Sequence, residues 1–158
     1  MKVLFVCTGN ICRSPTAEGV ARKLIAERSL SDHIEVVSAG THGYHVGDPP
    51  DSRSQAAAAR RDVDISAQRA RQVRAEDFDE FSLIMAMDRS HEKILRRAAP
   101  PSAESRVRLF LDYAPDLGHV DVPDPYYGAG DGFEIVLDLV EAAVNGLIDA
   151  IEREHNFK

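Results

Sequence analysis

Two kinds of hydrophobic pattern alternate along the chain. Short apolar runs at residues 3–6, 34–39, 82–87 and 107–110 predict four β-strands. Apolar residues recur at helical spacing over residues 14–25, 51–61, 89–98 and 133–155, and these segments predict helices. Strands that alternate with helices indicate parallel pairing through right-handed crossovers. We therefore expect an α/β fold, a three-layer sandwich in which a four-stranded parallel sheet carries helices on both faces.

The segment between the first strand and the first helix is the most informative part of the sequence. It reads Cys-Thr-Gly-Asn-Ile-Cys-Arg-Ser-Pro over residues 7–15. Ser14 is a favourable N-cap, Pro15 suits the first helical position, and Gly9 allows a sharp backbone turn. A loop that leads into a helix points its amide groups and the positive end of the helix dipole at one place. Such a place binds phosphate or a similar oxyanion.

Two side chains add chemistry to this predicted anion site. Cys7 lies at its mouth, where the positive field favours the thiolate, the nucleophilic form of cysteine. Arg13 follows with five residues between, so the loop can bring its guanidinium beside the thiol to grip two phosphate oxygens. A structural cysteine near a surface arginine is the alternative. The preceding strand, the glycine and the Ser-Pro helix start favour a reaction centre.

A second candidate lies in the proline-rich segment 121–128. Phosphoryl transfer from an aryl ester requires an acid that protonates the leaving oxygen. Asp124 stands between Pro123 and Pro125, which restrict its backbone and make it the favoured acid. Asp121 lies outside the prolines and is the weaker candidate. Ordinary turn chemistry is the alternative for Asp124.

Composition limits the function further. With 158 residues, 44% of them hydrophobic, the chain has the size and composition of one soluble domain over residues 1–158. A net charge of −7 argues against nucleic acid and anionic membranes as partners. The sequence shows no signal peptide and no run that could span a bilayer, so we expect a cytoplasmic protein. The two cysteines, Cys7 and Cys12, both lie in the loop, which excludes a disulfide framework.

Residues 6–15 and the Asp-Pro-Tyr-Tyr-Gly sequence at 124–128 resemble the two diagnostic motifs of the low-molecular-weight protein tyrosine phosphatases. The resemblance extends over nearly the whole chain. It implies the strand order 2-1-3-4, which would place the Cys7 loop at a topological switch point. It also implies hydrolysis of phosphotyrosine through a cysteinyl-phosphate intermediate (EC 3.1.3.48), with no metal and no organic cofactor.

The resemblance assigns roles to individual residues. Cys7 is expected to be the nucleophile, Arg13 the phosphate clamp, and Asp124 the general acid and then the general base. Ser14 is expected to hydrogen-bond the thiolate and ease its departure in the second step. The expected phosphate-binding residues are Thr8, Gly9, Asn10, Ile11, Cys12, Arg13 and Ser14.

Three tyrosines and the second cysteine receive supporting roles by the same resemblance. Tyr44, Tyr126 and Tyr127 are expected to form the wall of the substrate cleft, and ordinary loop packing is the alternative. Cys12 is expected to protect an oxidised Cys7 by trapping it as a reversible disulfide. The alternative is that Cys12 fills space in the loop.

The resemblance also implies a hydrogen-bond network behind the loop. Asn10 is expected to hold the loop in shape together with Ser38, although Ser38 could instead satisfy its own strand end. Gln68 stands where many members of the family have a histidine. Glutamine donates and accepts hydrogen bonds but cannot titrate, which puts the stability of this network in question. Asp88, at the end of the third strand, is expected to cap the next helix.

Two polar clusters have ordinary explanations. His42, His45 and Asp48 could hold a metal, but loop histidines without further ligands are usually solvated. A basic cluster is expected to form a solvated face, with phosphopeptide contact as the alternative; its members are Arg60, Arg61, Arg69, Arg71 and Arg74.

Three other functions are alternatives to phosphotyrosine hydrolysis. Arsenate reductases of similar fold share the Cys-x5-Arg loop, but their thiol relay needs cysteines that this chain lacks. Protein-arginine phosphatases tend to have threonine where Ile11 stands. A module that only binds phosphate or senses redox state gains nothing from Asp124. The expected partner is a tyrosine-phosphorylated protein, with a bacterial-type tyrosine kinase as one candidate. We expect a monomer, with a weak dimer as the alternative.

Overall fold

The strands form one parallel sheet. The structure, a computed structural model, describes residues 1–128 and 131–155. Its sheet has the order β2-β1-β3-β4, built from β1 (Lys2–Cys7), β2 (Glu35–Gly40), β3 (Leu83–Ala86) and β4 (Val107–Leu109). All three strand pairs are parallel. The predicted strand order is therefore confirmed, and the predicted strands agree with the observed ones to within one residue at each end.

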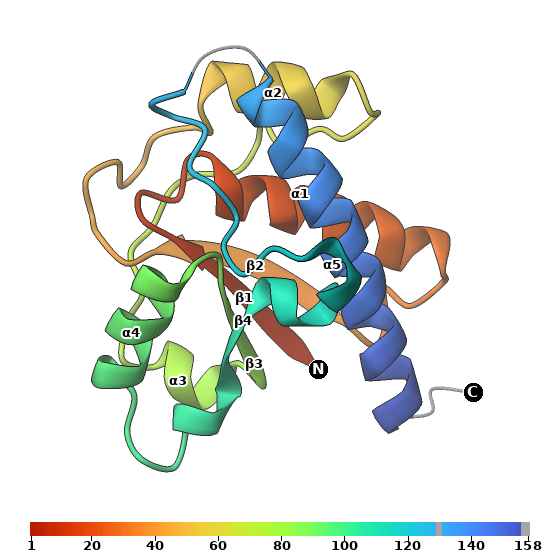
Figure 1. Cartoon of the computed structure of the whole chain (residues 1–158). Helices are drawn as coiled ribbons and strands as arrows, with labels where there is room; N and C mark the ends of the chain where they lie inside the picture. Colours follow the sequence, from red (N-terminus) through yellow and green to blue (C-terminus); the bar gives the residue numbers. More distant parts are fainter. Residues whose placement is uncertain (129–130, 156–158) are drawn as a thin grey trace.

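Helices cover both faces of this sheet, as predicted. Figure 1 shows α1 (Arg13–Glu27), α2 (Ser52–Ala59) and α5 (Gly132–His155) on one side. The other side carries α3 (Asp77–Glu80) and α4 (Arg89–Ala98). Short 3-10 turns lie at Glu104–Arg106, Phe110–Tyr113 and Pro115–Leu117. The sequence did not predict α3 or these turns, because segments of three or four residues are too short to show helical periodicity.

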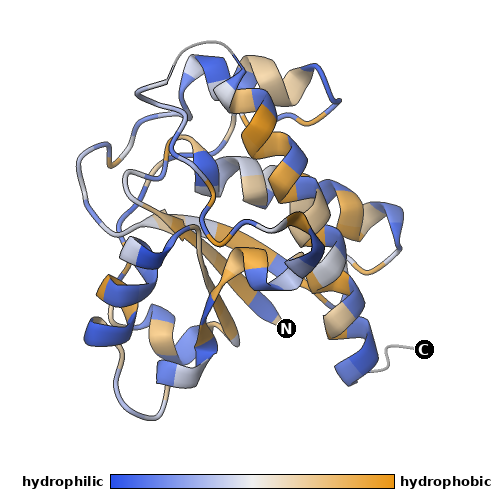
Figure 2. Ribbon diagram, viewed as in Figure 1, coloured by the Kyte–Doolittle hydropathy of each residue, from blue (hydrophilic) through white to orange (hydrophobic). Residues whose placement is uncertain are grey.

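The core consists of two layers separated by the sheet. Because side chains alternate along a strand, Val3, Phe5 and Cys7 of β1 face α1 and α5, whereas Leu4 and Val6 face α3 and α4. Figure 2 shows the strands as a continuous hydrophobic band between the two helical layers. In the described ranges, no helix has the length and apolarity needed to cross a membrane. Burial of β1 on both faces fixes the position of the loop that follows it.

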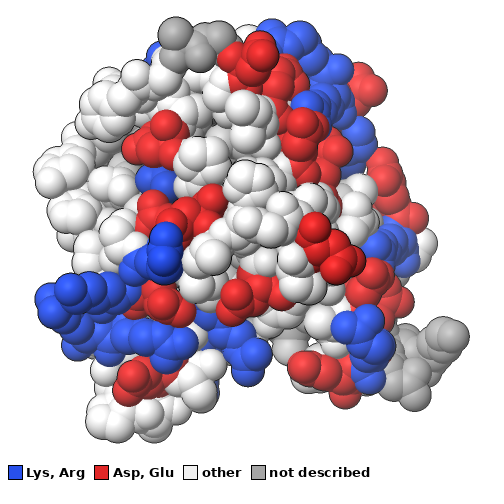
Figure 3. All heavy atoms as spheres, in the orientation of Figure 1, with Lys and Arg blue, Asp and Glu red and all other residues white. Residues whose placement is uncertain are grey.

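Arginines of the basic cluster predicted from the sequence form ion pairs while some of them, such as Arg60, stay exposed to solvent as expected. Arg60 and Arg61, which follow α2, form ion pairs of 2.8 Å with Glu134 at the start of α5. Arg61 also pairs with Asp138 and Glu141 one and two turns further along. Basic and acidic side chains accordingly alternate over the upper part of α5 in Figure 3. These pairs attach the end of α2 to α5.

Candidate active site

The loop from Thr8 to Cys12 joins the carboxyl end of β1 to α1. Two of its carbonyl groups accept hydrogen bonds from neighbouring segments. The carbonyl of Thr8 accepts from the amide of His42, and the carbonyl of Ile11 accepts from the amide of Asp51. In the described part of the chain, no amide from Thr8 to Cys12 donates to a protein acceptor. The loop therefore has free amides beside a helix N-terminus, the arrangement that binds an oxyanion.

Two residues allow the loop to fold so tightly. Asn10 has a φ of 59°, in the left-handed region that asparagine tolerates better than most residues. Its side chain donates to Ser14 Oγ and Ser38 Oγ and accepts from the amide of Arg71. The backbone also bends at Gly9 as expected, without a positive φ, and a Cβ there would lie 2.9 Å from the ring of His45. A Cβ on Gly40 would lie 2.7 Å from the carbonyl oxygen of Thr8, so this close approach requires glycine.

Ser14 is not the N-cap of α1. The helix begins at Arg13, Cys12 occupies the cap position, and no side chain caps the helix. Ser14 is instead completely buried, with Oγ 3.0 Å from the Sγ of Cys7. The cap interpretation was wrong because the loop closes one residue earlier than the Ser-Pro pair suggests, which leaves the hydroxyl free to contact the thiol.

A buried carboxylate that the sequence analysis missed completes the network behind the loop. Ser38 Oγ donates to Oε1 of Glu18 at 2.8 Å, and the other oxygen of Glu18 pairs with Arg22 at 3.0 Å. Burial raises the pKa of Glu18, although the hydrogen bond from Ser38 and the charge of Arg22 oppose this. Gln68 donates to the carbonyl of Pro15 at 3.0 Å and lies 3.5 Å from Ser38, so it does join the network at its edge. The spacing of Glu18 and Arg22, one helical turn apart, was the available signal.

Two hydrogen bonds hold one side of the Arg13 guanidinium. Its Nη1 donates to Oδ2 of Asp88 at 2.7 Å and to the carbonyl of Val122 at 3.0 Å. Asp88 also caps α4, as predicted, by accepting from the amide of His91. Only 4% of the Arg13 side chain is exposed, so its guanidinium has little freedom to turn. Nη2, the other terminal nitrogen, lies 3.5 Å from the hydroxyl of Thr8 and 3.5 Å from Oδ2 of Asp124.

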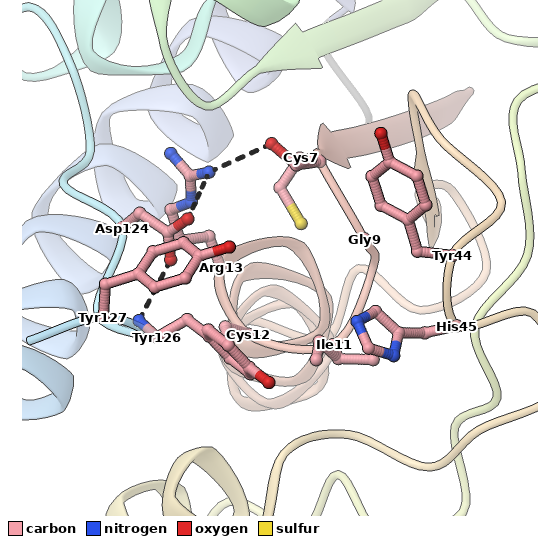
Figure 4. A pocket seen from close by; sticks show the side chains of 11 residues that line it. Cys7, Gly9, Ile11, Cys12, Arg13, Tyr44, His45, Asp124, Tyr126 and Tyr127 are labelled. Carbon is pink, nitrogen blue, oxygen red and sulfur yellow. Dashed lines mark hydrogen bonds and ion pairs between the residues drawn. The ribbon is translucent and has the colours of Figure 1, made fainter.

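The loop and the proline-rich segment meet in one pocket, with a cavity volume of about 90 Å³. The predicted nucleophile, clamp and acid all line it, and Oδ2 of Asp124 lies 3.5 Å from Nη2 of Arg13. In Figure 4, the sulfur of Cys7 lies between Asp124 and Tyr127 on one side and Tyr44 and His45 on the other. Thr8, Gly9, Ile11 and Cys12 also line the pocket, whereas the side chains of Asn10 and Ser14 lie behind it.

Asp121, the competing acid, is engaged elsewhere. Its carboxylate accepts from the amide and the guanidinium of Arg89 at the start of α4. These hydrogen bonds lower the pKa of Asp121, against a small opposing effect of burial. Asp121 does not line the pocket, so only Asp124 is placed to reach a substrate there.

All three predicted wall tyrosines line the pocket. Tyr127 and Tyr44 are 87% and 72% exposed, and their rings project from the rim. Tyr126 is more restricted, because the guanidinium of Arg53 lies 5.3 Å from the centre of its ring. Tyr127 in turn lies edge-on to Tyr126, with ring centres 5.0 Å apart, so the rim combines two exposed aromatic rings with one that is held in place.

The loop histidines have separate partners. His42 stacks on Tyr44 with ring centres 5.0 Å apart, and its Nδ1 lies 2.8 Å from the hydroxyl of Thr41. His45 lies at the pocket, 3.4 Å from Asp48. It was expected to be a solvated loop residue, but its ring packs so close to Gly9 that a Cβ there would come within 2.9 Å.

Cys12 has an environment that keeps its thiol protonated. It is buried, and desolvation raises its pKa to about 12, against a lowering effect of a hydrogen bond with Ser54. The nearby charge of Asp51 contributes to the raised pKa. Both cysteines are free thiols in the structure. Cys12 is thus placed at the pocket as a neutral thiol.

The comparisons with known proteins agree with this geometry. Residues 2–157 match the family model described as low molecular weight phosphotyrosine protein phosphatase. The chain belongs to this family. A Streptomyces coelicolor member, named low molecular weight protein-tyrosine-phosphatase, is 44% identical over 156 residues that cover 97% of this chain and 94% of that protein. The crystal structure of a protein tyrosine phosphatase from Entamoeba histolytica has a TM-score of 0.95 at 38% identity and covers 98% of each chain.

The fold also occurs in a protein with a different stated substrate. The crystal structure of an arginine phosphatase from Drosophila has a TM-score of 0.88 at 30% identity and covers 96% of this chain and 98% of that one. Fold similarity alone therefore does not distinguish phosphotyrosine from phosphoarginine as the substrate of this phosphatase family member, and the choice depends on the pocket.

Proposed function

We propose that this protein hydrolyses phosphotyrosine in proteins through a cysteinyl-phosphate intermediate. The observation that supports this most strongly is the meeting of Cys7, Arg13 and Asp124 in one pocket, although Asp124 lies far from the other two in the sequence. A site that only bound phosphate would gain nothing from a carboxylate that, like that of Asp124, lines the pocket where the anion binds.

In the first step, the Cys7 thiolate attacks the phosphorus atom in line with the bond to the tyrosine oxygen. The S–P bond forms, the P–O bond breaks, and protonated Asp124 gives its proton to the departing oxygen. The free amides of the loop and the pocket-side nitrogens of Arg13 hold the phosphoryl oxygens. Bound phosphate takes the place of the contact between Arg13 and Asp124.

In the second step, water attacks the phosphorus atom of the intermediate. Asp124, now a carboxylate, takes a proton from this water while the S–P bond breaks. The electron pair returns to Cys7, whose sulfur lies 3.0 Å from the hydroxyl of Ser14. A hydrogen bond from Ser14 stabilises the departing thiolate, which is the role proposed for this residue.

The rim of the pocket favours an aryl substrate. Tyr127 and Tyr44 can pack on the two faces of a phenyl ring that reaches down to Cys7. Ile11, at the pocket floor, adds apolar surface beside the ring. In phosphoarginine, the group that would lie between these tyrosines is a polar guanidinium, which would gain less from the contacts than a phenyl ring does. We therefore assign phosphotyrosine as the substrate.

The proposal includes a protective role for Cys12. An oxidant such as hydrogen peroxide converts the Cys7 thiolate to a sulfenic acid. The Cys12 thiol then attacks this sulfur, forming a disulfide and releasing water. Because burial raises the pKa of Cys12 to about 12, little thiolate is present at neutral pH and this attack is slow. The proposed partners are tyrosine-phosphorylated proteins, including a tyrosine kinase, and the proposed state is a monomer in the cytoplasm, where thiols stay reduced.

The acid role of Asp124 can be tested by varying the leaving group. In Asp124→Asn, kcat/KM for an aryl phosphate with a weakly acidic phenol should fall by about 10²–10⁴-fold. For a strongly acidic phenol, which leaves without a proton, the loss should be much smaller. Asp121→Asn is the matched control and should keep the wild-type dependence on the leaving group, since Asp121 lies outside the pocket. Equal losses for all phenols would exclude the acid role.

The substrate is tested with peptides that carry phosphotyrosine, phosphoserine or phosphoarginine in the same sequence. We expect hydrolysis of the phosphotyrosine peptide with the highest kcat/KM. Preference for phosphoarginine would overturn the substrate and leave the chemical steps unchanged. Binding without turnover of any peptide would indicate a module that only recognises phosphate.

A further inference from the structure

Four polar side chains beside the pocket, one of them Arg13, form a closed ring of contacts. Nη1 of Arg13 contacts Asp88 at 2.7 Å, and Nη2 donates to the hydroxyl of Thr8 at 3.5 Å. This hydroxyl lies 2.8 Å from Nε2 of His91. Nδ1 of His91 in turn lies 3.1 Å from Asp88, which brings the ring back to its start. The proposed chemical steps use Arg13 but none of the other three.

His91 is the unexplained member of the ring. It lies on the first turn of α4, is only 1% exposed, and no mechanism step involves it. Its Nδ1 is buried and makes no aligned hydrogen bond, although the Asp88 carboxylate is close. A buried polar atom without a hydrogen-bond partner calls for a structural or functional explanation. Its Nε2 does have a partner, the hydroxyl of Thr8 in the phosphate loop.

The directions of the protons follow from the charges at either end of the ring. A neutral imidazole carries one ring proton, and the Asp88 carboxylate, 3.1 Å from Nδ1, favours that proton on Nδ1. Nε2 is then the acceptor, so the Thr8 hydroxyl donates its proton to His91 and accepts from Nη2 of Arg13, which can only donate. The opposite tautomer would direct a lone pair at that carboxylate. Every group in the ring therefore has one orientation, provided that His91 is neutral.

We propose that His91 is a positioning residue for catalysis: through the hydroxyl of Thr8 it fixes the second nitrogen of Arg13 in the plane that faces the phosphate. Asp88 holds one end of the guanidinium, and the Thr8–His91 pair holds the other. Arg13 and the phosphate loop are thus oriented before the substrate arrives. This inference rests on the proposed role of Arg13 as phosphate clamp.

The environment of His91 keeps it in the required neutral state. Its pKa is lowered from 6.5 to about 4, chiefly by burial and secondly by the positive charge of Arg13. Asp88 and Asp124 act in the opposite direction, and His42 adds a small lowering effect. His91 is therefore an acceptor across the neutral pH range.

The test uses variants that remove or retain single atoms of the ring. Thr8→Val keeps the shape of the side chain and removes the hydroxyl, whereas Thr8→Ser keeps the hydroxyl. His91→Leu removes the acceptor, whereas His91→Gln keeps an amide oxygen near the position of Nε2. We expect Thr8→Val and His91→Leu each to lower kcat/KM for an aryl phosphate about tenfold, with most of the loss in kcat, because a lost hydrogen bond has about this value. Thr8→Ser and His91→Gln should stay within about threefold of the wild type.

The double variant Thr8→Val/His91→Leu distinguishes positioning from separate structural effects. If both residues act on Arg13 through one connection, the double variant should be no worse than the worse single variant. Losses that multiply, or wild-type activity in Thr8→Val, would overturn the inference. Vanadate binding measured by calorimetry gives the same comparison without turnover. If the wild type binds vanadate but hydrolyses no phosphoester, the proposed function fails while the ring can still be tested.

Discussion

Acid pH should destabilise this protein specifically through His91. The imidazole is 1% exposed and its pKa is lowered from 6.5 to about 4, chiefly by burial. Between these two values the unfolded chain binds a proton at His91 that the folded protein does not. Stability is therefore fully present above pH 6.5 and falls as the pH decreases towards 4, below which no further loss arises from this group.

The size of this effect follows from the two pKa values. One pKa unit corresponds to about 1.4 kcal/mol, so the drop from 6.5 to about 4 corresponds to about 3 kcal/mol of unfolding free energy. The loss should have a slope of up to about 1.4 kcal/mol per pH unit in the middle of the range. This is a large part of the stability of a typical domain.

Urea unfolding followed by circular dichroism between pH 4 and 7 measures this slope. His91→Gln cannot titrate, so its unfolding free energy should fall less than that of the wild type, with the difference reaching about 3 kcal/mol at the acid end. His119→Gln, at an exposed position, is the matched control and should follow the wild type. Parallel curves for the wild type and His91→Gln would refute the argument, because they would mean that His91 titrates alike in the folded and unfolded states.

Three further predictions concern the loop. Arg13→Lys should lower kcat/KM for aryl phosphates by about 10²–10³-fold, because lysine cannot hold two oxygens in one plane, and near-normal kinetics would contradict the clamp role. Gly40→Ala should lower the melting temperature and activity together, since its Cβ would lie 2.7 Å from the Thr8 carbonyl, whereas Gly128→Ala, with its nearest atom at 3.7 Å, should change neither. After brief peroxide treatment, Cys12→Ser should recover a smaller share of its own starting activity on addition of thiol than the wild type does, and equal recovery would remove the protective role.

The sequence predicted the features that local patterns control. The apolar runs identified four strands, and the order of these strands in the sheet followed from the family resemblance. Cys7 and Arg13 were found because a strand, a tight loop and a helix are adjacent in the chain, and Asp124 because two prolines mark it. Asp88 was correctly interpreted as a helix cap, a local role, whereas its contact with Arg13 spans 75 positions of sequence.

What the sequence did not predict depends on contacts between distant segments. His91 acquires its role from Thr8, 83 positions away, and no local pattern distinguishes it from an ordinary helical histidine. Glu18 of α1 is buried and accepts a hydrogen bond from Ser38 of β2, a contact between segments 20 positions apart. The misplaced cap at Ser14 has another origin: propensity favours serine as a helix cap, but the contact of its hydroxyl with the sulfur of Cys7 decides its position.

The covalent intermediate is the central claim, and rapid quenching tests it most directly. The protein is mixed with an aryl phosphate of an acidic phenol, quenched within milliseconds, digested, and analysed by mass spectrometry for a phosphoryl group on each cysteine-containing peptide. We expect one phosphoryl group on the Cys7 sulfur, at a higher level in Ser14→Ala, where the thiolate departs without the hydrogen bond seen at 3.0 Å. Turnover with no phosphoryl group on Cys7 in either protein, or with one on Cys12, would contradict the account.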